Sequence, residues 1–209
     1  MLKARVGQEM QMQSLSVSPI FKVILLIALG CGVLQLGMDN FVYSRTEMLD
    51  QPWRWWTAHW VHVGWRHYAL NMLAFMSLPF IFPHIRPKTL WLSVFILPPL
   101  LSAGLYGCMP DVQAYAGFSG ILHGIYVLVA IESLKIPRER KFALLVLACI
   151  LIKLSLEYWF GYTETAQLIQ APVLIESHQI GVVTGLMFAL ISGGGQWLLA
   201  RLKHQTTHH

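Results

Sequence analysis

The stretch GFSGILHG, residues 117–124, places one serine and one histidine within an otherwise apolar run. Gly120 and Gly124 are four residues apart, a small-residue spacing that lets two membrane helices approach closely. Ser119 and His123 are also four residues apart, so they share one helical face. A serine in such a run is most often a packing residue, because a free hydroxyl is a poor nucleophile without an adjacent base. Whether Ser119 is structural or reactive therefore depends on the rest of the chain.

The composition indicates an integral membrane protein. Of the 209 residues, 56% are hydrophobic and only 12% are charged, against about 25% charged residues in soluble domains. The length suits one helical domain of about six spans, at roughly 20 residues each. The net charge of +5 does not indicate a nucleic-acid partner, because the charges lie in short loops between apolar runs. The three cysteines predict no disulfide; they are Cys31, Cys108 and Cys149.

Six apolar runs predict six membrane-spanning helices between a short cytoplasmic tail, residues 1–18, and a C-terminal tail, residues 204–209. Between these tails, the predicted membrane domain covers residues 19–203. Pro98 and Pro99 lie inside the third run and are expected to kink or break its helix, since proline lacks a donor N–H. The runs are Ile20–Leu36, His67–Phe82, Thr89–Gly107, Ser119–Leu134, Phe142–Phe160 and Ser177–Leu202.

Basic residues orient these spans. With the N-terminus inside, most Lys and Arg residues fall on the inner side, and three arginines fall outside. This asymmetry predicts that both termini are cytoplasmic. The inner set is Lys3, Arg5, Lys22, Arg86, Lys88, Lys135, Arg138, Arg140, Lys141, Arg201 and Lys203, and the outer set is Arg45, Arg54 and Arg66.

The connection between the first two spans, from Gly37 to Arg66, is long and rich in tryptophan. Tryptophan favours the membrane–water interface, where its ring contacts both phases. We therefore expect this loop to lie in the interface of the outer leaflet. Its tryptophans are Trp53, Trp55, Trp56, Trp60 and Trp65.

Polar side chains within spans are costly and usually face a cavity or a partner. His67 and Asn71 are four residues apart near the outer end of the second span, so both can donate hydrogen bonds from one face. Two converging donors in a low-dielectric site suit a developing oxyanion. The alternative is that they form interhelical hydrogen bonds that hold the bundle together.

His178 begins the sixth span and precedes Gly181 and Gly185, which repeat the glycine spacing of the fourth span. If the two glycine faces pack together, the imidazole of His178 comes within reach of the Ser119 hydroxyl. His123 can also accept the serine proton, but a same-helix geometry aligns imidazole and hydroxyl less well than a facing helix does. We therefore expect His178 to be the base, with His123 packing on it or orienting it.

The carboxylates are poor candidates for a third catalytic member. Lys153 and Glu157 are four residues apart in the fifth span, and we interpret them as a structural or interfacial ion pair. Glu176 lies two residues before His178, on a different helical face, and Asp111 lies in a loop. The sequence therefore predicts a Ser–His dyad.

A histidine-dense segment offers a different class of function. His59, His62 and His67 are candidate ligands of a metal-dependent membrane enzyme or transporter. However, His62 and His67 are five residues apart, which is a poor spacing for one helical face, and no HExxH motif is present. We therefore predict no metal and no cofactor.

Together these segments resemble the rhomboid intramembrane serine proteases. WRWWTAHWVHVGWRHYALN, residues 53–71, resembles the Trp-Arg loop motif and the start of the second rhomboid span. GFSG, residues 117–120, resembles the GxSG nucleophile motif, and HQIGVVTG, residues 178–185, resembles the sixth span. The implied fold is an all-α membrane protein, a six-helix rhomboid bundle with an interfacial loop between spans one and two. Its fourth helix is expected to start in mid-membrane, below a cavity that is open to the outside.

The resemblance implies a role for each matching residue. Ser119 is the implied nucleophile and His178 the implied base and acid, while His67 and Asn71 take the oxyanion-stabilising positions with the backbone N–H of Ser119. The implied supporting residues near the site are His62, His123, Gly117 and Gly120. The implied structural motif residues are Trp53, Arg54, Gly181 and Gly185.

Two residues of this chain differ from the common rhomboid pattern, and they point to one branch of the family. Phe118 stands where the family commonly has Leu or Ala, and His123 stands where many rhomboids have Tyr. GFSGILHG thus looks like the rhombosortase branch, which implies membrane-anchored substrates with Gly-Gly-containing C-terminal tails, cleaved near the outer face with possible transfer to an amine. It also implies a location in a bacterial inner membrane with a periplasmic active site. The alternative within this family is a catalytically inactive protein that binds membrane clients.

Overall fold

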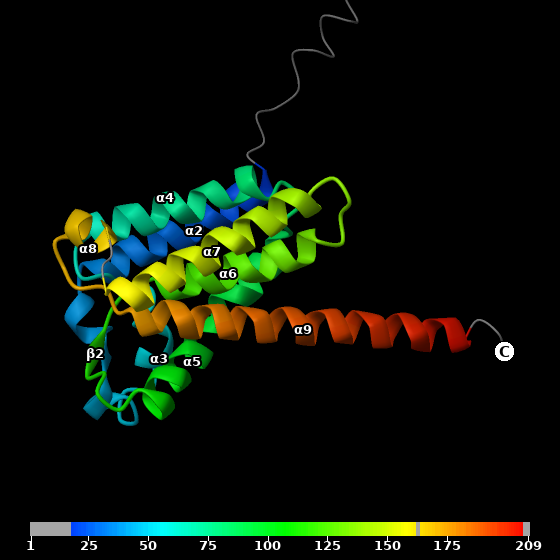
Figure 1. The fold of residues 1–209 in the computed structure, drawn as a ribbon. Coiled ribbons are helices and arrows are strands. Elements are labelled where there is room, and N and C mark those ends of the chain that lie inside the picture. The colour runs from blue at the N-terminus through cyan, green and yellow to red at the C-terminus, as the bar shows by residue number, and fades with distance from the viewer. Residues whose placement is uncertain (1–17, 162–163, 207–209) are drawn as a thin grey trace, which may run out of the picture.

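The computed structural model describes residues 18–161 and 164–206, so the tails 1–17 and 207–209 lie outside the described residues. The described chain is mainly helical, and its longer helices lie side by side in a bundle from which the end of α9 projects (Figure 1). These longer helices are α2 (Pro19–Gln35), α4 (Trp65–Ile81), α5 (Pro87–Cys108), α6 (Ser119–Ser133), α7 (Arg140–Phe160) and α9 (Ile175–Thr206). The shorter elements are η1 (Met38–Asn40), β1 (Tyr43–Ser44), η2 (Arg45–Glu47), α3 (Arg54–Thr57), β2 (Ala114–Tyr115) and α8 (Glu164–Ile169).

Each apolar run predicted from the sequence coincides with one of the longer helices. Within the described residues, three helical segments are long and apolar enough to cross a membrane: Pro87–Cys108, Arg140–Phe160 and Ile175–Ser192. Helices α2 and α6 are apolar but shorter. The helical character is therefore as expected, while a count of six spans stays a prediction.

The expected break in the third run does not occur. Helix α5 continues through Pro98 and Pro99, although Pro99 cannot donate a hydrogen bond to the carbonyl of Phe95 one turn earlier. The indole Nε1 of Trp56 donates to that carbonyl oxygen at 2.9 Å instead. A side chain from the long loop thus replaces one missing backbone bond, which is how packed membrane helices tolerate proline.

Helix α6 lies at the centre of the bundle and packs along α9 through glycine. Most side chains of α6 are buried. A Cβ atom added to Gly181 would collide with the carbonyl oxygen of Gly120, and one added to Gly185 would collide with that of Gly124. Only glycine permits this approach of the two backbones, so the two glycine faces hold the start of α9 against the start of α6.

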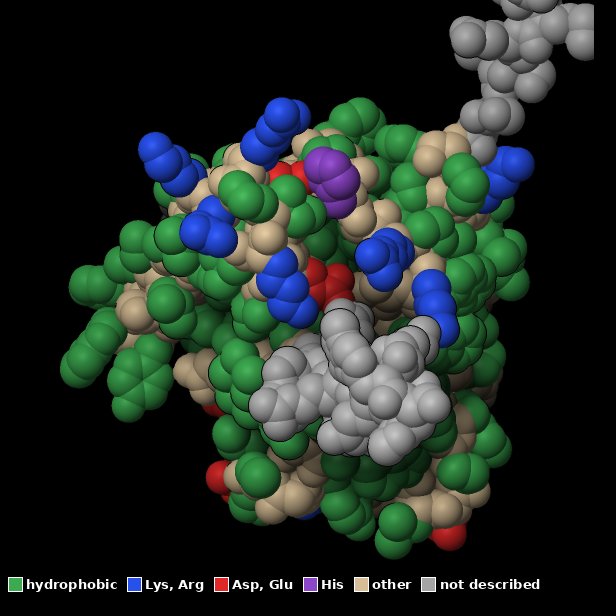
Figure 2. Space-filling view, turned by 90° about the vertical axis from the view of Figure 1, so that its right-hand side faces the viewer, with side chains coloured by type: hydrophobic (Ala, Val, Ile, Leu, Met, Phe, Trp, Pro, Cys, Tyr) green, Lys and Arg blue, Asp and Glu red, His purple; other side chains and the backbone are tan. Residues whose placement is uncertain are grey.

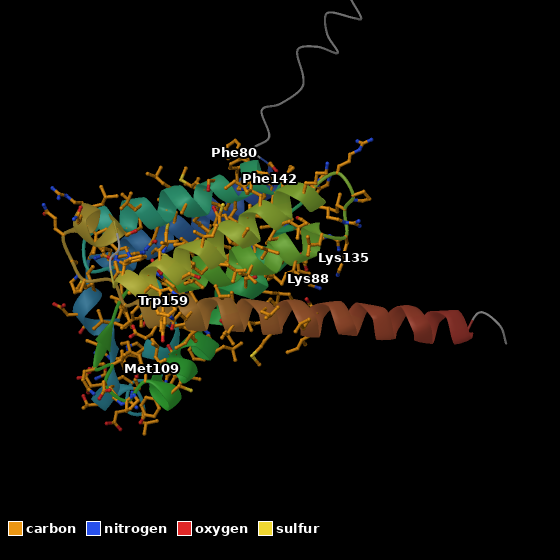
Figure 3. The ribbon with its side chains drawn as sticks, in the orientation of Figure 1. Phe80, Lys88, Met109, Lys135, Phe142 and Trp159 are labelled. Carbon is orange, nitrogen blue, oxygen red and sulfur yellow. The ribbon has the colours of Figure 1, made fainter. Side chains whose placement is uncertain are left out.

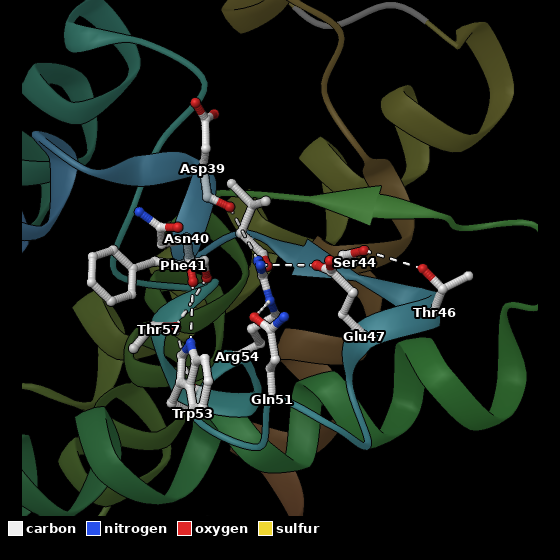
Figure 4. Close-up of polar contacts among 11 residues, drawn as sticks. Asp39, Asn40, Phe41, Ser44, Thr46, Glu47, Gln51, Trp53, Arg54 and Thr57 are labelled. Atoms are coloured by element: carbon white, nitrogen blue, oxygen red, sulfur yellow. Dashed lines mark hydrogen bonds and ion pairs between the residues drawn. The ribbon is translucent and has the colours of Figure 1, made fainter.

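Arg54 organises the long loop between α2 and α4 (Figure 4). Its side chain is buried and forms an ion pair with Glu47 at 2.9 Å. It also donates to the side chain of Gln51 at 2.9 Å and to the carbonyl oxygen of Val42 at 2.6 Å. The neighbouring Trp53 donates from Nε1 to the carbonyl oxygen of Asn40 at 3.1 Å. These contacts fold the loop onto itself.

The two ends of the bundle differ in charge. Lys88 and Lys135 lie at one end, and Met109 and Trp159 lie toward the other (Figure 3). Viewed from the lysine end, several Lys and Arg side chains surround a few acidic groups and one histidine (Figure 2). The loops and helix ends here hold the basic residues Arg86, Lys88, Lys135, Arg138, Arg140 and Lys141.

Candidate active site

Ser119 is the first residue of α6, and a sharp turn of the preceding backbone places it there. Gly117 has φ of +155°, a conformation that favours glycine. Its N–H donates to the carbonyl oxygen of Ala58 at 3.1 Å, which ties the turn to the long loop. A Cβ atom on Gly117 would lie 2.8 Å from Cε1 of His67. Glycine is therefore required at this position both for the turn and for contact with the imidazole.

His178 lies in the first turn of α9 and contacts Ser119 directly. Its Nε2 is 2.9 Å from the Ser119 Oγ, and its Nδ1 is 2.9 Å from Oε2 of Glu157. An ionised carboxylate can only accept a hydrogen bond, so Nδ1 carries the proton. Nε2 is then free to accept the hydrogen bond from the serine hydroxyl. The geometry is that of a nucleophile held by its base.

Glu157 corrects the expectation that no carboxylate reaches His178. It comes from α7, is 4% exposed, and also accepts a hydrogen bond from Lys153 one turn earlier. The Lys153–Glu157 ion pair thus exists as predicted, but its second carboxylate oxygen faces the catalytic candidate. The signal in the sequence was an ionisable residue within a span, which by itself suggests a functional site. Which way that residue faces depends on the packing of α7 and α9.

His123 stacks on His178. The ring centroids are 4.2 Å apart and the planes are inclined by 20°. Nδ1 of His123 is 2.8 Å from the carbonyl oxygen of Ser119, so this nitrogen is the donor and carries the proton. His123 therefore contacts the backbone of Ser119 and the face of His178, whereas His178 contacts the serine hydroxyl.

His67 and Asn71 lie on one face of α4 and line the same cavity as Ser119 and His178. Both are buried, at 7% and 6% exposure. Within the described part of the chain, Nδ2 of Asn71 has no hydrogen-bond partner. Buried amide groups are nearly always paired, and Asn71 lines the cavity, so its amide N–H groups are available to a group bound there.

His62 supports the ring of His67 from the long loop. The two rings meet edge to face with centroids 5.1 Å apart. The side chain of Gln35 holds His62 through two backbone contacts, accepting from its N–H at 2.8 Å and donating to its carbonyl oxygen at 2.7 Å. Burial, followed by the neighbouring His67, lowers the pKa of His62 to about 3.

The three histidines that the metal alternative requires do not lie together: His59 is in one place, and His62 and His67 are in another. His59 is fully buried beside Ser102, with Nε2 2.8 Å from its Oγ, whereas His62 packs on His67. Across the described ranges 18–161 and 164–206, no three His, Cys, Asp or Glu side chains lie together in a way that could hold a metal ion. The donor set required by the metal alternative is therefore not assembled here.

Tyr115 is a site residue that sequence reasoning did not single out. Its hydroxyl donates to the carbonyl oxygen of Gly117 at 2.6 Å, and its ring packs on His59 with centroids 5.3 Å apart. It also pairs with Tyr43 across the two-residue strands β1 and β2. Tyr115 therefore supports the turn that presents Ser119. Only its place just before GFSG could have suggested this.

Two cavities meet at Ser119. The larger, about 310 Å³, lies among α4, α6, α7 and α8. The smaller, about 220 Å³, lies toward β2 and the segment before α9. Apolar side chains dominate the larger cavity, and its polar lining includes Ser119, His123 and His178. The Ser–His pair is therefore next to a largely apolar space. Its lining residues include Leu70, Leu122, Tyr126, Ile150 and Leu168.

Comparison with known families identifies the family of this chain. Residues 49–194 match the model of the Rhomboid domain family. Because the match covers well over half of the chain, this protein belongs to the rhomboid family. The members of this family are intramembrane serine proteases, so the chain is a membrane protein and a peptide-bond hydrolase of the rhomboid type. A comparison with curated proteins found no significant match.

Proposed function

We propose that Ser119 is the nucleophile of this protease and that His178 is its general base and acid. The observation that carries the proposal is the contact of 2.9 Å between His178 Nε2 and Ser119 Oγ at the wall of a largely apolar cavity. A serine hydroxyl becomes an effective nucleophile only when a base can take its proton. His178 is buried at 2% exposure, whereas Ser119 borders the cavity, so the base is held within the protein and the hydroxyl faces the space where a substrate would bind.

The proposed reaction is acyl transfer in two stages. Ser119 Oγ forms a bond to the scissile carbonyl carbon while its proton moves to Nε2 of His178, and the carbonyl oxygen becomes an oxyanion. The C–N bond then breaks, and His178 gives the proton to the leaving nitrogen. Water next attacks the acyl-enzyme by the same route, releasing a carboxylic acid and restoring the Ser119 hydroxyl.

His67 and Asn71 are the proposed oxyanion donors, together with the backbone N–H of Ser119. Their support is their common cavity and the unpaired amide donor of Asn71 within the described chain. The N-terminal end of α6 adds a favourable dipole at the same place. By analogy with soluble serine proteases, each donor contributes about 2.7–4 kcal/mol to the transition state.

The proposed orientation places both termini in the cytoplasm of a bacterial inner membrane. The basic loops at the Lys88 and Lys135 end support this, because cytoplasmic loops carry excess Lys and Arg. The start of α6, with Ser119, would then face the periplasmic side, and the tryptophan-rich loop would lie at the outer interface.

The proposed substrates are membrane-anchored proteins with Gly-Gly-containing C-terminal tails, as in the rhombosortase branch. His123, one turn after the serine, supports this branch through the resemblance described above. The larger cavity, with few polar groups, suits an apolar segment of such a tail. If an amine intercepts the acyl-enzyme in place of water, the product is a transferred chain.

Co-expression with a Gly-Gly-tailed reporter tests the function. Wild type is expected to shorten the reporter, and Ser119→Ala is expected to leave it at full length. Mass spectrometry of the new C-terminus separates a free carboxylate from an amide formed by transfer. Equal processing by wild type and Ser119→Ala would overturn the proposal.

A further inference from the structure

Helix α7 buries a carboxylate although most of its surface faces outward. Among its residues, Ala143 and Glu157 are the buried ones, while its large apolar side chains are widely exposed. Ionisable side chains within membrane spans are costly and usually mark a functional site. The inward position of Glu157 therefore requires partners that compensate for its burial.

The two oxygens of Glu157 have different partners. Oε1 accepts a hydrogen bond from Nζ of Lys153, and Oε2 is 2.9 Å from Nδ1 of His178. Lys153 is 42% exposed and lines the larger cavity, so its cation lies at the edge of the site. The carboxylate charge is thus balanced on one side while the other oxygen remains available to the imidazole.

We propose that Glu157 is a positioning residue that completes a Ser119–His178–Glu157 triad, an assignment that rests on the proposed function. Its carboxylate keeps the proton of His178 on Nδ1, so that Nε2 can accept the proton of Ser119. When Nε2 takes that proton, the resulting imidazolium lies against a negative charge. Glu157 itself stays ionised throughout, as the carboxylate of a serine-protease triad does.

The alternative is that Glu157 only fastens α7 to α9. The contacts of the His178 ring distinguish a positioning role from a purely structural one. The carboxylate contacts one nitrogen of the same ring whose other nitrogen contacts the serine. A fastening role does not require this continuous line of three groups, and it does not require the carboxylate to be charged. An amide of the same shape would serve for fastening and would fail in the triad.

Steady-state kinetics of purified enzyme in detergent, with the reporter as substrate, tests the assignment. We expect Glu157→Gln to lower kcat by roughly 10²–10⁴-fold with KM changed by less than about 3-fold, because an amide can stabilise the wrong imidazole tautomer. Glu157→Asp should recover part of kcat relative to Glu157→Ala. The matched control is Glu132→Gln, which removes a carboxylate at the opposite end of α6.

A second pair of variants separates stability from catalysis. Lys153→Met leaves the buried carboxylate without its cation and should lower the thermal unfolding temperature, whereas Lys141→Met on the exposed end of α7 should not. Adding Glu157→Gln to Lys153→Met removes the unbalanced charge. The double variant should therefore regain thermal stability and yet keep the low kcat of Glu157→Gln.

Three outcomes would overturn the assignment. One is a folded Glu157→Gln enzyme with kcat within about 3-fold of wild type. Another is a parallel loss of kcat, substrate affinity and unfolding temperature in every Glu157 variant, with Asp no better than Ala, since this would indicate fastening alone. Wild type that neither cleaves the reporter nor reacts at Ser119 would overturn the proposed function itself, and the triad with it.

Discussion

At the scale of the residue, two histidines lie beside the same serine, and their hydrogen bonds differ. His178 reaches the hydroxyl of Ser119 with Nε2 at 2.9 Å. His123 reaches the backbone carbonyl oxygen of Ser119 at 2.8 Å and stacks on the ring of His178. The first contact allows a proton to move from the hydroxyl of Ser119 to His178, whereas the second involves only the Ser119 backbone. The two rings therefore have separable roles.

This difference predicts opposite outcomes for two substitutions. His178→Ala should lower kcat for the reporter by about 10⁴-fold or more, since it removes the proposed base. His123→Tyr keeps an aromatic ring that can stack on His178, and it should retain measurable activity. Initial rates of reporter cleavage by the two purified variants check this. An active His178→Ala enzyme beside an inactive His123→Tyr enzyme would reverse the assignment.

The sequence allowed the Ser119–His178 pair to be predicted because each residue lies in the first turn of a helix that carries a glycine face. Packing of these two glycine faces against each other brings the starts of the two helices together. The partnership of His178 with Glu157 was not predictable in the same way. Helix α7 is apolar nearly all round, so no periodic pattern marks which of its faces points inward.

At the scale of the element, the contact between α6 and α9 positions the site. Gly181→Ala would drive a Cβ atom into the carbonyl oxygen of Gly120. We expect the helices to separate, with a loss of about 1–3 kcal/mol in stability, as for other overpacked sites. The rate of reporter cleavage should fall by more than the loss of folded protein explains, because His178 lies three residues from the substitution and would shift with the helix.

Gly30→Ala is the matched control, since nothing lies within 4 Å of a Cβ atom at that position of α2. It should leave both the unfolding temperature and reporter cleavage near wild type. The two variants are compared by thermal unfolding in detergent and by cleavage rate. Equal behaviour of Gly181→Ala and Gly30→Ala would show that close packing of the glycine faces is not required.

The buried histidines of the long loop predict how stability depends on pH. Burial lowers the pKa of His59 and of His62 to about 3, from an ordinary value of 6.5. Between these values the unfolded chain binds more protons than the folded chain. Stability is therefore fully present above about pH 6.5 and falls as the pH drops, by about 1.4 kcal/mol per pH unit for each ring.

Thermal unfolding of wild type and His62→Phe at pH 8 and pH 5 measures this effect. The difference between the two pH values should be smaller in His62→Phe, since one of the titrating groups is gone. An identical pH dependence in both proteins would contradict the burial of a neutral His62.

The long helices themselves were largely predictable, because long apolar runs specify helices. The fold of the loop was not. Strands β1 and β2 have two residues each, so the pairing of Tyr43 with Tyr115 leaves no periodic signal. The unbroken course of α5 was also missed, because the group that contacts the Phe95 carbonyl is a tryptophan far away in the sequence.

At the scale of the whole molecule, the proposed orientation predicts which thiols are reached from outside. Cys108 is exposed at the end of α5, opposite the basic loops. In a variant lacking Cys31 and Cys149, a membrane-impermeant maleimide should label Cys108 in intact spheroplasts. The control adds Arg138→Cys to a chain without Cys108, and its labelling should require permeabilised membranes. The reverse pattern would invert the proposed topology.

The central claim is that this rhomboid-family chain is a serine protease whose nucleophile is Ser119 and whose base is His178. Its most direct test is to treat the membrane-embedded enzyme with a fluorophosphonate and to locate the adduct by mass spectrometry. We expect one modified site, Ser119, with labelling lost in His178→Ala although the variant remains folded. An adduct on a different residue, or undiminished labelling of Ser119 without His178, would contradict it.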